Sequence, residues 1–158
     1  MIKVLFVCLG NICRSPLAHG ILLNEINKRG LNGKIQVDSC GTSQYHIGEP
    51  PDSRTVENAR QNGINLDHKA RQFERSDFRE FDYIVAMDNA NRTNALRLDQ
   101  TFEFSGKVLL MRDFDQGYEG TDVPDPYFGG EKGFQNVFDI LNRSVNTFVD
   151  HLIEKHNL

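Results

Sequence analysis

The sequence has few cysteines, no CxxC pair and no long apolar run. Three cysteines without a framework spacing are untypical of a disulfide-stabilised secreted protein, and no Cys/His cluster suggests a metal site. A membrane-spanning helix needs about 20 apolar residues, and the N-terminus lacks the charged region and apolar core of a signal peptide. These absences predict a cytoplasmic protein that needs no metal or other cofactor.

The chain also has no excess of basic residues. Lys and Arg number 18 against 22 Asp and Glu, for a formal net charge of −4. Nucleic-acid and anionic-membrane binders need a basic face, so we expect neither partner. A chain of 158 residues without internal repeats is long enough for one domain over 1–158 with a proper core. Any anion site must therefore be a local feature.

Short apolar runs alternate with amphipathic segments along the chain. The runs predict strands at 2–7, 34–39, 82–87 and 107–111, and the amphipathic segments predict helices at 17–26, 53–63, 88–98 and 134–152. The polar stretch 68–80 mixes both signs of charge, which is typical of a solvated surface. Alternating strands and helices favour an α/β fold, a doubly wound parallel sheet between two helical layers. Loops that follow the strands then meet at one edge of the sheet, where ligands bind.

The stretch 8–16, Cys-Leu-Gly-Asn-Ile-Cys-Arg-Ser-Pro, joins the first strand to the first helix. We expect Ser15 to cap that helix and Pro16 to occupy its first turn. At such a junction the backbone N–H groups and the helix dipole converge on an anion.

The residue types in this loop suit phosphate chemistry. A thiol at a helix N-terminus beside a guanidinium is stabilised as a thiolate, so Cys8 is a candidate nucleophile, although a cysteine that ends an apolar strand is also a common core residue. Arg14 offers a planar fork for two oxygens of an oxyanion, and Ser15 offers a hydroxyl to the sulfur. Gly10 permits close backbone approach, and Asn11 tolerates a left-handed turn.

A general acid is expected in the loop 113–130, because expulsion of an alcohol from phosphorus is helped by a proton donor. Four aspartates lie there: Asp113, Asp115, Asp122 and Asp125. Two prolines flank Asp125 and stiffen its backbone, and Tyr127 and Phe128 follow it and could wall a slot for an aromatic ring. Turn formation alone is the alternative explanation of this composition.

The segment CLGNICRS resembles the signature of the low-molecular-weight protein tyrosine phosphatases. The motifs 38–42, 82–88 and 125–128 follow in the order and approximate spacing of that family. The resemblance implies a flavodoxin-like strand order 2-1-3-4, with strand 1 central. It also implies a phosphate-binding loop between strand 1 and helix 1, formed by Leu9, Gly10, Asn11, Ile12, Cys13 and Ser15 around Cys8 and Arg14.

The resemblance also implies roles for individual residues. Asp125 matches the general acid and base, Ser39 and His68 match supports that brace Asn11, and Cys13 matches a partner for a reversible disulfide with Cys8. The substrate rim would consist of Ile12, Tyr45, Tyr127 and Phe128. Cys40 is expected to be buried and inert, and His19 and His151 fall on polar helix faces with no assigned role.

The function implied is hydrolysis of phosphotyrosine and other aryl phosphates through a phosphocysteine on Cys8. Expected partners are tyrosine-phosphorylated proteins or peptides and inorganic phosphate, which is both product and competing ligand, and the expected state is a monomer or weak dimer. Three alternatives stay open. A phosphoarginine phosphatase is disfavoured by Ile12, where that subset has Thr, and a thioredoxin-coupled arsenate reductase by the lack of cysteines in 87–98. The third is a non-catalytic phosphoprotein-binding module, for which a nucleophile and an acid are unnecessary.

Overall fold

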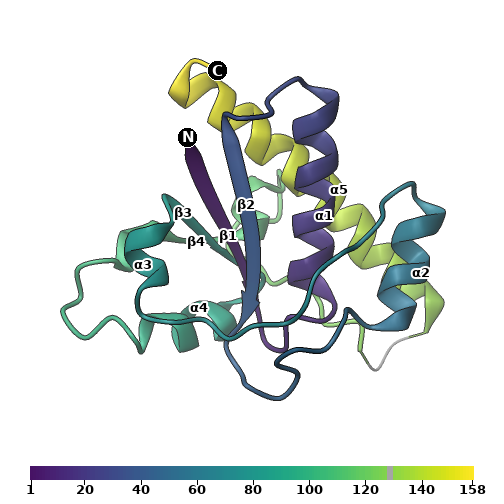
Figure 1. Ribbon diagram of the computed structural model, residues 1–158, viewed down its shortest axis with the longest axis horizontal. Coiled ribbons are helices and arrows are strands. Elements are labelled where there is room, and N and C mark those ends of the chain that lie inside the picture. The colour runs from purple at the N-terminus through teal and green to yellow at the C-terminus, as the bar shows by residue number, and fades with distance from the viewer. Residues whose placement is uncertain (128–129) are drawn as a thin grey trace.

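The computed structural model describes residues 1–127 and 130–158, which fold as a parallel sheet between two helical layers (Figure 1). Phe128, one of the expected rim residues, lies outside the described residues. The strands are β1 (Ile2–Cys8), β2 (Ile35–Gly41), β3 (Tyr83–Ala86) and β4 (Val108–Leu110). The helices are α1 (Arg14–Lys28), α2 (Ser53–Gln61), α3 (Asp77–Glu80), α4 (Asn89–Leu96) and α5 (Glu131–His156), with 3₁₀ turns η1 (Ser105–Lys107) and η2 (Met111–Phe114).

The strand order is β2-β1-β3-β4 and every pairing is parallel, which confirms the predicted fold. Strand β1 is central, and its last residue, Cys8, lies opposite Gly41 at the end of β2. A Cβ atom on Gly41 would lie 2.6 Å from the carbonyl oxygen of Leu9. The glycine therefore lets the loop after β1 pack directly against the end of β2.

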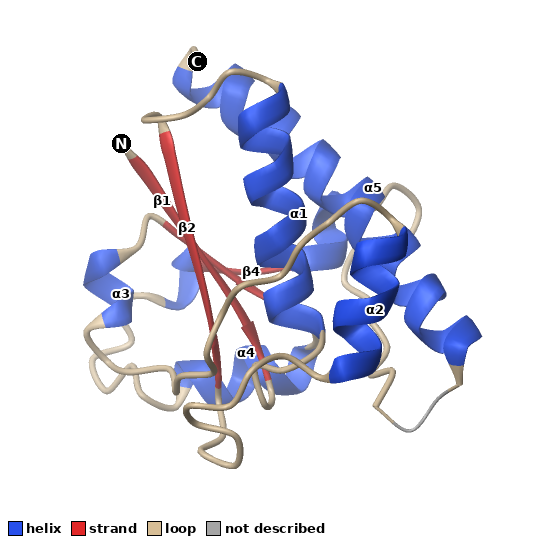
Figure 2. Cartoon of the chain, turned by 45° about the vertical axis from the view of Figure 1, so that its right-hand side comes forward, coloured by secondary structure: helices blue, strands red, loops and turns tan. Residues whose placement is uncertain are grey.

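Alternation along β1 divides the interior into two apolar layers. Val4 and Phe6 face α1 and α5, whereas Leu5 and Val7 face the layer that contains Phe78 of α3 and Ala95 of α4. Figure 2 shows α1, α2 and α5 on one side of the strands and α3 on the other. The predicted stripe of the last helix is buried as expected, but α5 extends beyond 134–152 at both ends.

Helix α1 begins at Arg14, three residues before the predicted start at 17, and the expectation that Ser15 caps it is wrong. Cys13 is the N-cap and forms no side-chain capping bond, while Ser15 lies within the first turn, fully buried. Its hydroxyl contacts Cys8 instead. Pro16 is the third helical residue, a position whose N–H has no intrahelical acceptor, so proline is tolerated there.

The polar stretch 68–80 is less solvated than predicted. Arg71 bonds Asp38 of β2 at 2.9 Å and both oxygens of Asp77 at 3.1 Å, and Asp77 is buried at the start of α3. This ion-pair network fixes the segment against the edge of β2. Within the described ranges, no helix is both long and apolar enough to cross a membrane.

Candidate active site

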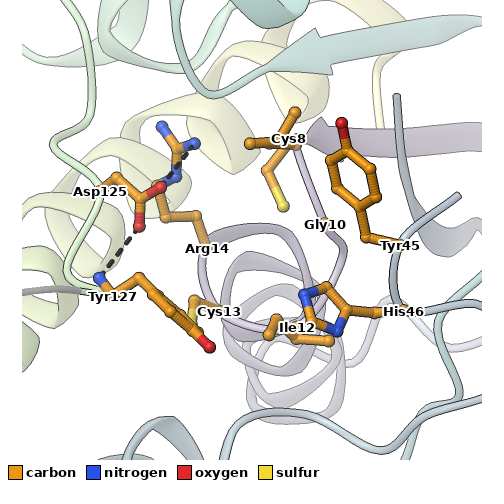
Figure 3. Close-up of a pocket in the computed structure, with 10 residues that line it drawn as sticks. Cys8, Gly10, Ile12, Cys13, Arg14, Tyr45, His46, Asp125 and Tyr127 are labelled. Atoms are coloured by element: carbon orange, nitrogen blue, oxygen red, sulfur yellow. Dashed lines mark hydrogen bonds and ion pairs between the residues drawn. The ribbon is translucent and has the colours of Figure 1, made fainter. Parts of the chain in front are cut away.

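A cavity of about 210 Å³ lies where the loops after β1 and β2 meet the long loop before α5 (Figure 3). These loops emerge at the same edge of the sheet, as the topology predicts. The lining residues are Cys8, Leu9, Gly10, Ile12, Cys13, Arg14, Tyr45, His46, Asp125 and Tyr127. The cavity therefore brings the expected nucleophile, arginine and acid together.

The loop backbone turns its carbonyl groups away from the cavity. The carbonyls of Cys8 and Leu9 accept hydrogen bonds from the N–H groups of Thr42 and Ser43 at 2.9 Å, and that of Ile12 accepts from Asp52 at 2.8 Å. In a trans peptide the N–H points opposite to the preceding C=O. The amides that follow these carbonyls are thereby directed to the inner side of the loop, where an anion accepts their hydrogen bonds.

Cys8 is buried at the base of this loop, and two donors reach its sulfur. The Oγ atom of Ser15 lies 2.9 Å from Sγ, and the backbone N–H of Asn11 points at Sγ from 3.3 Å. Hydrogen bonds to a charged acceptor are stronger than those to a neutral one, so both contacts stabilise negative charge that the sulfur carries as a leaving group.

The orientation of the Asn11 side chain is fixed by an unambiguous donor. Asn11 has a positive φ of 57° and is fully buried. Its Oδ1 accepts from the backbone N–H of Arg71 at 3.1 Å and lies 2.7 Å from Nε2 of His68. Since a backbone N–H cannot accept, this side-chain atom must be the oxygen, and Nε2 of His68 must carry a proton. Nδ2 donates to Ser15 Oγ at 2.8 Å and to Ser39 Oγ at 3.1 Å.

The Asn11 amide also orients the Ser15 hydroxyl. Because Ser15 Oγ already accepts from Asn11, its own single proton is available for donation. Cys8 Sγ at 2.9 Å is nearer than the alternative acceptor, the carbonyl of Cys40 at 3.3 Å. Asn11 therefore directs the hydroxyl proton of Ser15 toward the sulfur.

Ser39 and His68 lie where the sequence reading placed them, on the side chain of Asn11, but His19 was missed. Its Nδ1 lies 3.1 Å from Ser39 Oγ, and its ring meets that of His68 edge to face at 5.3 Å. Ser39 Oγ accepts from Asn11, and Nε2 of His68 is itself a donor, so neither can take the hydroxyl proton of Ser39. This proton is therefore donated to Nδ1 of His19. The expectation that His19 lies idle on a polar face is wrong, because that face of α1 packs against β2 and the His68 segment. His151 is exposed on α5, where its ring contacts Phe114.

This histidine pair gives a prediction for the pH dependence of stability. Burial lowers the pKa of His19 from 6.5 to about 4 and also lowers that of His68. Between these values the unfolded chain binds a proton at His19 that the folded chain does not, so the free energy of unfolding falls as the pH falls from 6.5 to about 4. We expect urea denaturation of the wild type to show a loss larger by on the order of 2 kcal/mol than that of His19→Gln. Equal losses in both proteins would contradict the assignment.

The guanidinium of Arg14 is held by two groups that the sequence did not predict as its partners. Nη1 bonds Asp88 Oδ2 at 2.7 Å and the carbonyl of Val123 at 2.9 Å. Burial opposes the charge of Arg14, yet the neighbouring Cys8 and Asp88 raise its pKa above the ordinary value. Asp88 Oδ1 also accepts from Asn91 N–H at 2.6 Å, so the carboxylate that caps α4 as predicted also orients the arginine.

Of the four aspartates in the loop 113–130, only Asp125 lines the cavity in the described structure. Its Oδ2 lies 3.8 Å from Arg14 Nη2, and its Oδ1 accepts from the N–H of Tyr127 at 3.0 Å (Figure 3). Asp113 accepts from two backbone amides, Asp115 pairs with Arg112 and Arg143, and Asp122 accepts from Asn89. The three other carboxylates are thus committed to holding the loop.

Comparisons with known proteins identify the family of this chain. Residues 3–158 match the family model described as low molecular weight phosphotyrosine protein phosphatase. The chain belongs to this family. A relative of that name from Schizosaccharomyces pombe is 45% identical, with 87% of this chain and 88% of the relative covered.

Solved structures show the same likeness. The protein tyrosine phosphatase of Entamoeba histolytica, crystallised with Hepes in its active site, superimposes with a TM-score of 0.93 at 42% identity and covers all of both chains. The arginine phosphatase of Drosophila gives a TM-score of 0.89 at 34% identity over 96% of this chain and 98% of its own. The fold is therefore shared by relatives whose names give different substrates.

The rim of the phosphatase cavity is partly aromatic. Tyr45 and Tyr127 line it from opposite loops, with Ile12 and His46 between them, and Tyr45 is 76% exposed. A Cβ atom on Gly10 would lie 2.9 Å from His46 Cδ2, so the glycine leaves room for that ring. The Arg54 guanidinium lies 5.2 Å from the centre of the Tyr127 ring. This contact, which supports the aromatic wall, was not anticipated.

The two other cysteines of this family member are buried. Burial raises the pKa of Cys13 to about 12, with Asp52 adding to the effect, and raises that of Cys40 as well. Cys13 lines the cavity, whereas Cys40 lies in the apolar layer on the α3 side of the sheet. Cys40 is thus buried as expected.

Proposed function

We propose that this protein is a metal-independent protein tyrosine phosphatase that hydrolyses phosphotyrosine and related aryl phosphate monoesters. The observation that carries the proposal is the joint placement of Cys8, Arg14 and Asp125 around one small cavity. A binding module needs the anion cradle alone, whereas this cavity also holds a thiol with two donors on its sulfur and a carboxylate at its mouth.

In the first step the Cys8 thiolate attacks phosphorus and the phenolic oxygen leaves. The loop amides and Arg14 bind the non-bridging oxygens, and this fixed positive field stabilises the charge that develops on them. Asp125 protonates the leaving oxygen. The ion pair with Asp88 holds Arg14 in place for this purpose.

In the second step water attacks the phosphocysteine, with Asp125 accepting the proton of that water. The sulfur leaves as a thiolate, which the hydroxyl of Ser15 stabilises, and inorganic phosphate is released. Phosphate is therefore a product and a competing ligand.

Asp125→Ala tests the acid role. We expect the first turnover to release phenol from phenyl phosphate about 10²–10⁴-fold more slowly, while first-turnover release from esters of strongly acidic phenols, whose anions leave without protonation, slows far less. Glu119→Ala is a matched control, because this carboxylate lies in the same loop and, among the described residues, accepts only from Gly117 N–H. Equal losses for both classes of leaving group would remove Asp125 from the acid role.

We propose that the rim formed by Ile12, Tyr45 and Tyr127 determines which substrate is hydrolysed. Two aromatic side chains suit a phenyl ring, and isoleucine offers an apolar contact. Phosphoarginine is the second candidate substrate, because the Drosophila relative is named an arginine phosphatase. Initial rates on phosphotyrosine, phosphoserine and phosphoarginine peptides, with EDTA present, separate the candidates. Phosphotyrosine should be hydrolysed fastest, and preference for either other peptide would overturn the assignment.

We also propose that Cys8 and Cys13 form a reversible disulfide. Peroxide would oxidise the Cys8 thiolate to a sulfenic acid. The sulfur of Cys13 would then attack the sulfur of Cys8 and expel water, which leaves a disulfide between the two residues. Both cysteines are free in the structure and both line the cavity. Burial raises the pKa of Cys13 to about 12, so Cys13 is a protonated thiol that peroxide attacks slowly. Its place on the wall of the same cavity makes it the partner of an oxidised Cys8.

The proposal extends to the partners, the cellular location and the oligomeric state. The partners are tyrosine-phosphorylated proteins or peptides in the cytoplasm, with no role for nucleic acid or membranes, and the protein acts as a monomer or weak dimer in a single domain over 1–158.

A further inference from the structure

Three side chains gather near the outer edge of the sheet, next to the polar network that supports Asn11. His19 comes from α1, Asp38 from the edge strand β2, and His68 from the segment between α2 and α3. One potential ligand atom from each lies within 4.8 Å of the other two, and all three residues are partly exposed. None of the three lines the catalytic cavity.

The donor types fit a divalent transition metal. Two imidazoles and one carboxylate are a common set for Zn²⁺, with the fourth position left to water. A tetrahedral zinc ion with ligands about 2.1 Å away separates those ligands by about 3.4 Å. Atoms that already lie within 4.8 Å of one another reach that separation through small side-chain rotations.

Each of the three side chains also has an outer partner. Nε2 of His68 donates to Asn11 Oδ1 at 2.7 Å, which leaves the ring's lone pair on Nδ1. His19 contacts Ser39 Oγ, and Asp38 Oδ2 accepts from Arg71. Metal-ligating histidines almost always bond a carbonyl, carboxylate or water through their other nitrogen. These orienting contacts are already in place for His68 and Asp38. For His19, whose Nδ1 accepts from Ser39, the imidazole proton must move from Nε2 to Nδ1 when Nε2 binds the ion.

The local charge balance admits a cation. Arg71 is the positive group beside Asp38, and it is shared with a second carboxylate, Asp77. These three groups together carry one net negative charge.

We propose that His19, Asp38 and His68 form a binding site for a divalent transition-metal ion such as Zn²⁺, separate from the catalytic cavity. The sequence suggested no metal site because its ligands lie 19 and 30 residues apart on three different elements. The proposed phosphatase reaction does not use this ion. A result that disproves the metal site would therefore leave the proposed reaction unaffected, and the reverse also holds.

Cobalt titration of the Cys8→Ser protein tests the proposal. Co²⁺ reports nitrogen and oxygen ligands through its visible absorption, and the substitution removes the most reactive thiolate as a competing ligand. We expect one equivalent to bind without a sulfur-to-cobalt charge-transfer band, and Zn²⁺ to displace it. Failure to bind, or a spectrum with sulfur ligation, would overturn the proposal.

Added substitutions locate the ion. In the Cys8→Ser background, His19→Gln and Asp38→Asn should each weaken cobalt binding by at least about tenfold. His151→Gln is the matched control, because this exposed histidine of α5 lies outside the cluster, and it should bind cobalt like the parent. Circular dichroism checks that each variant folds. Equal cobalt affinity in all variants would show that the ion binds elsewhere.

Calorimetric titration of inorganic phosphate separates this site from the catalytic loop. Because His68 keeps its bond to Asn11 through Nε2 when Nδ1 binds the ion, Zn²⁺-loaded Cys8→Ser should bind phosphate as tightly as the metal-free protein, within about twofold. A tenfold loss of phosphate affinity would show that the ion disrupts the loop, and the proposed ligand arrangement would be wrong.

Discussion

Cys8→Ser should reduce turnover of p-nitrophenyl phosphate by about 10⁵-fold or more, the scale on which removing a nucleophile acts in other hydrolases, while phosphate binding is retained. The serine hydroxyl ionises far less readily than a thiol, but the loop amides and Arg14 are unchanged. Steady-state kinetics measure the first effect and calorimetric titration of inorganic phosphate the second.

Cys40→Ala is the control for this substitution. Cys40 is fully buried and lies outside the cavity, so its loss should leave turnover within a few-fold of the wild type. Substantial turnover by Cys8→Ser would mean that another group attacks phosphorus.

Arg14→Lys should lower kcat by about 10³–10⁵-fold, the range attributed to an arginine that stabilises a transferring phosphoryl group. Lysine keeps the charge but lacks the planar fork, so it cannot bond Asp88, the Val123 carbonyl and phosphate oxygens together. Single-turnover kinetics and phosphate titration together measure the defect.

Arg97→Lys is the matched control, since this arginine is exposed at the end of α4 and its side chain, within the part of the chain that the structure describes, bonds only Asn94. It should behave like the wild type. If Arg14→Lys instead binds phosphate with normal affinity and turns over within tenfold, the geometry of the fork is unimportant and our account of Arg14 is wrong.

The sequence predicted those parts of the site that are local. Cys8, Arg14 and the loop between them lie within one strand–loop–helix junction, whose apolar pattern and glycine can be read directly. The strand order follows from the family resemblance, and the parallel sheet from the alternation of strands and helices.

Contacts between distant segments could not be read in the same way. Asp88 was identified as a helix cap, but its second oxygen meets Arg14, which is 74 residues away. His19 was dismissed because a helix pattern does not show that β2 packs against that face. Serine is a common N-cap residue, yet the hydroxyl of Ser15 turns to Cys8 because Asn11 already donates to it.

The choice among the four aspartates of the long loop shows the same limit. Composition left Asp113, Asp115, Asp122 and Asp125 open, and only the partners of each side chain distinguish them. Arg143 lies on α5, 28 residues from Asp115, so the commitment of that carboxylate is invisible to local sequence reasoning.

The proposed mechanism requires that the phosphoryl group is bonded covalently to Cys8 during each turnover. Asp125→Ala, mixed with an aryl phosphate whose leaving group needs no proton, should still form the phosphocysteine but hydrolyse it slowly, because the base for water is gone. Acid quenching within one turnover, followed by peptide mass spectrometry, should find one phosphoryl group on the peptide that contains Cys8. A phosphoryl group on another residue, or turnover without any phosphoenzyme, would contradict the account.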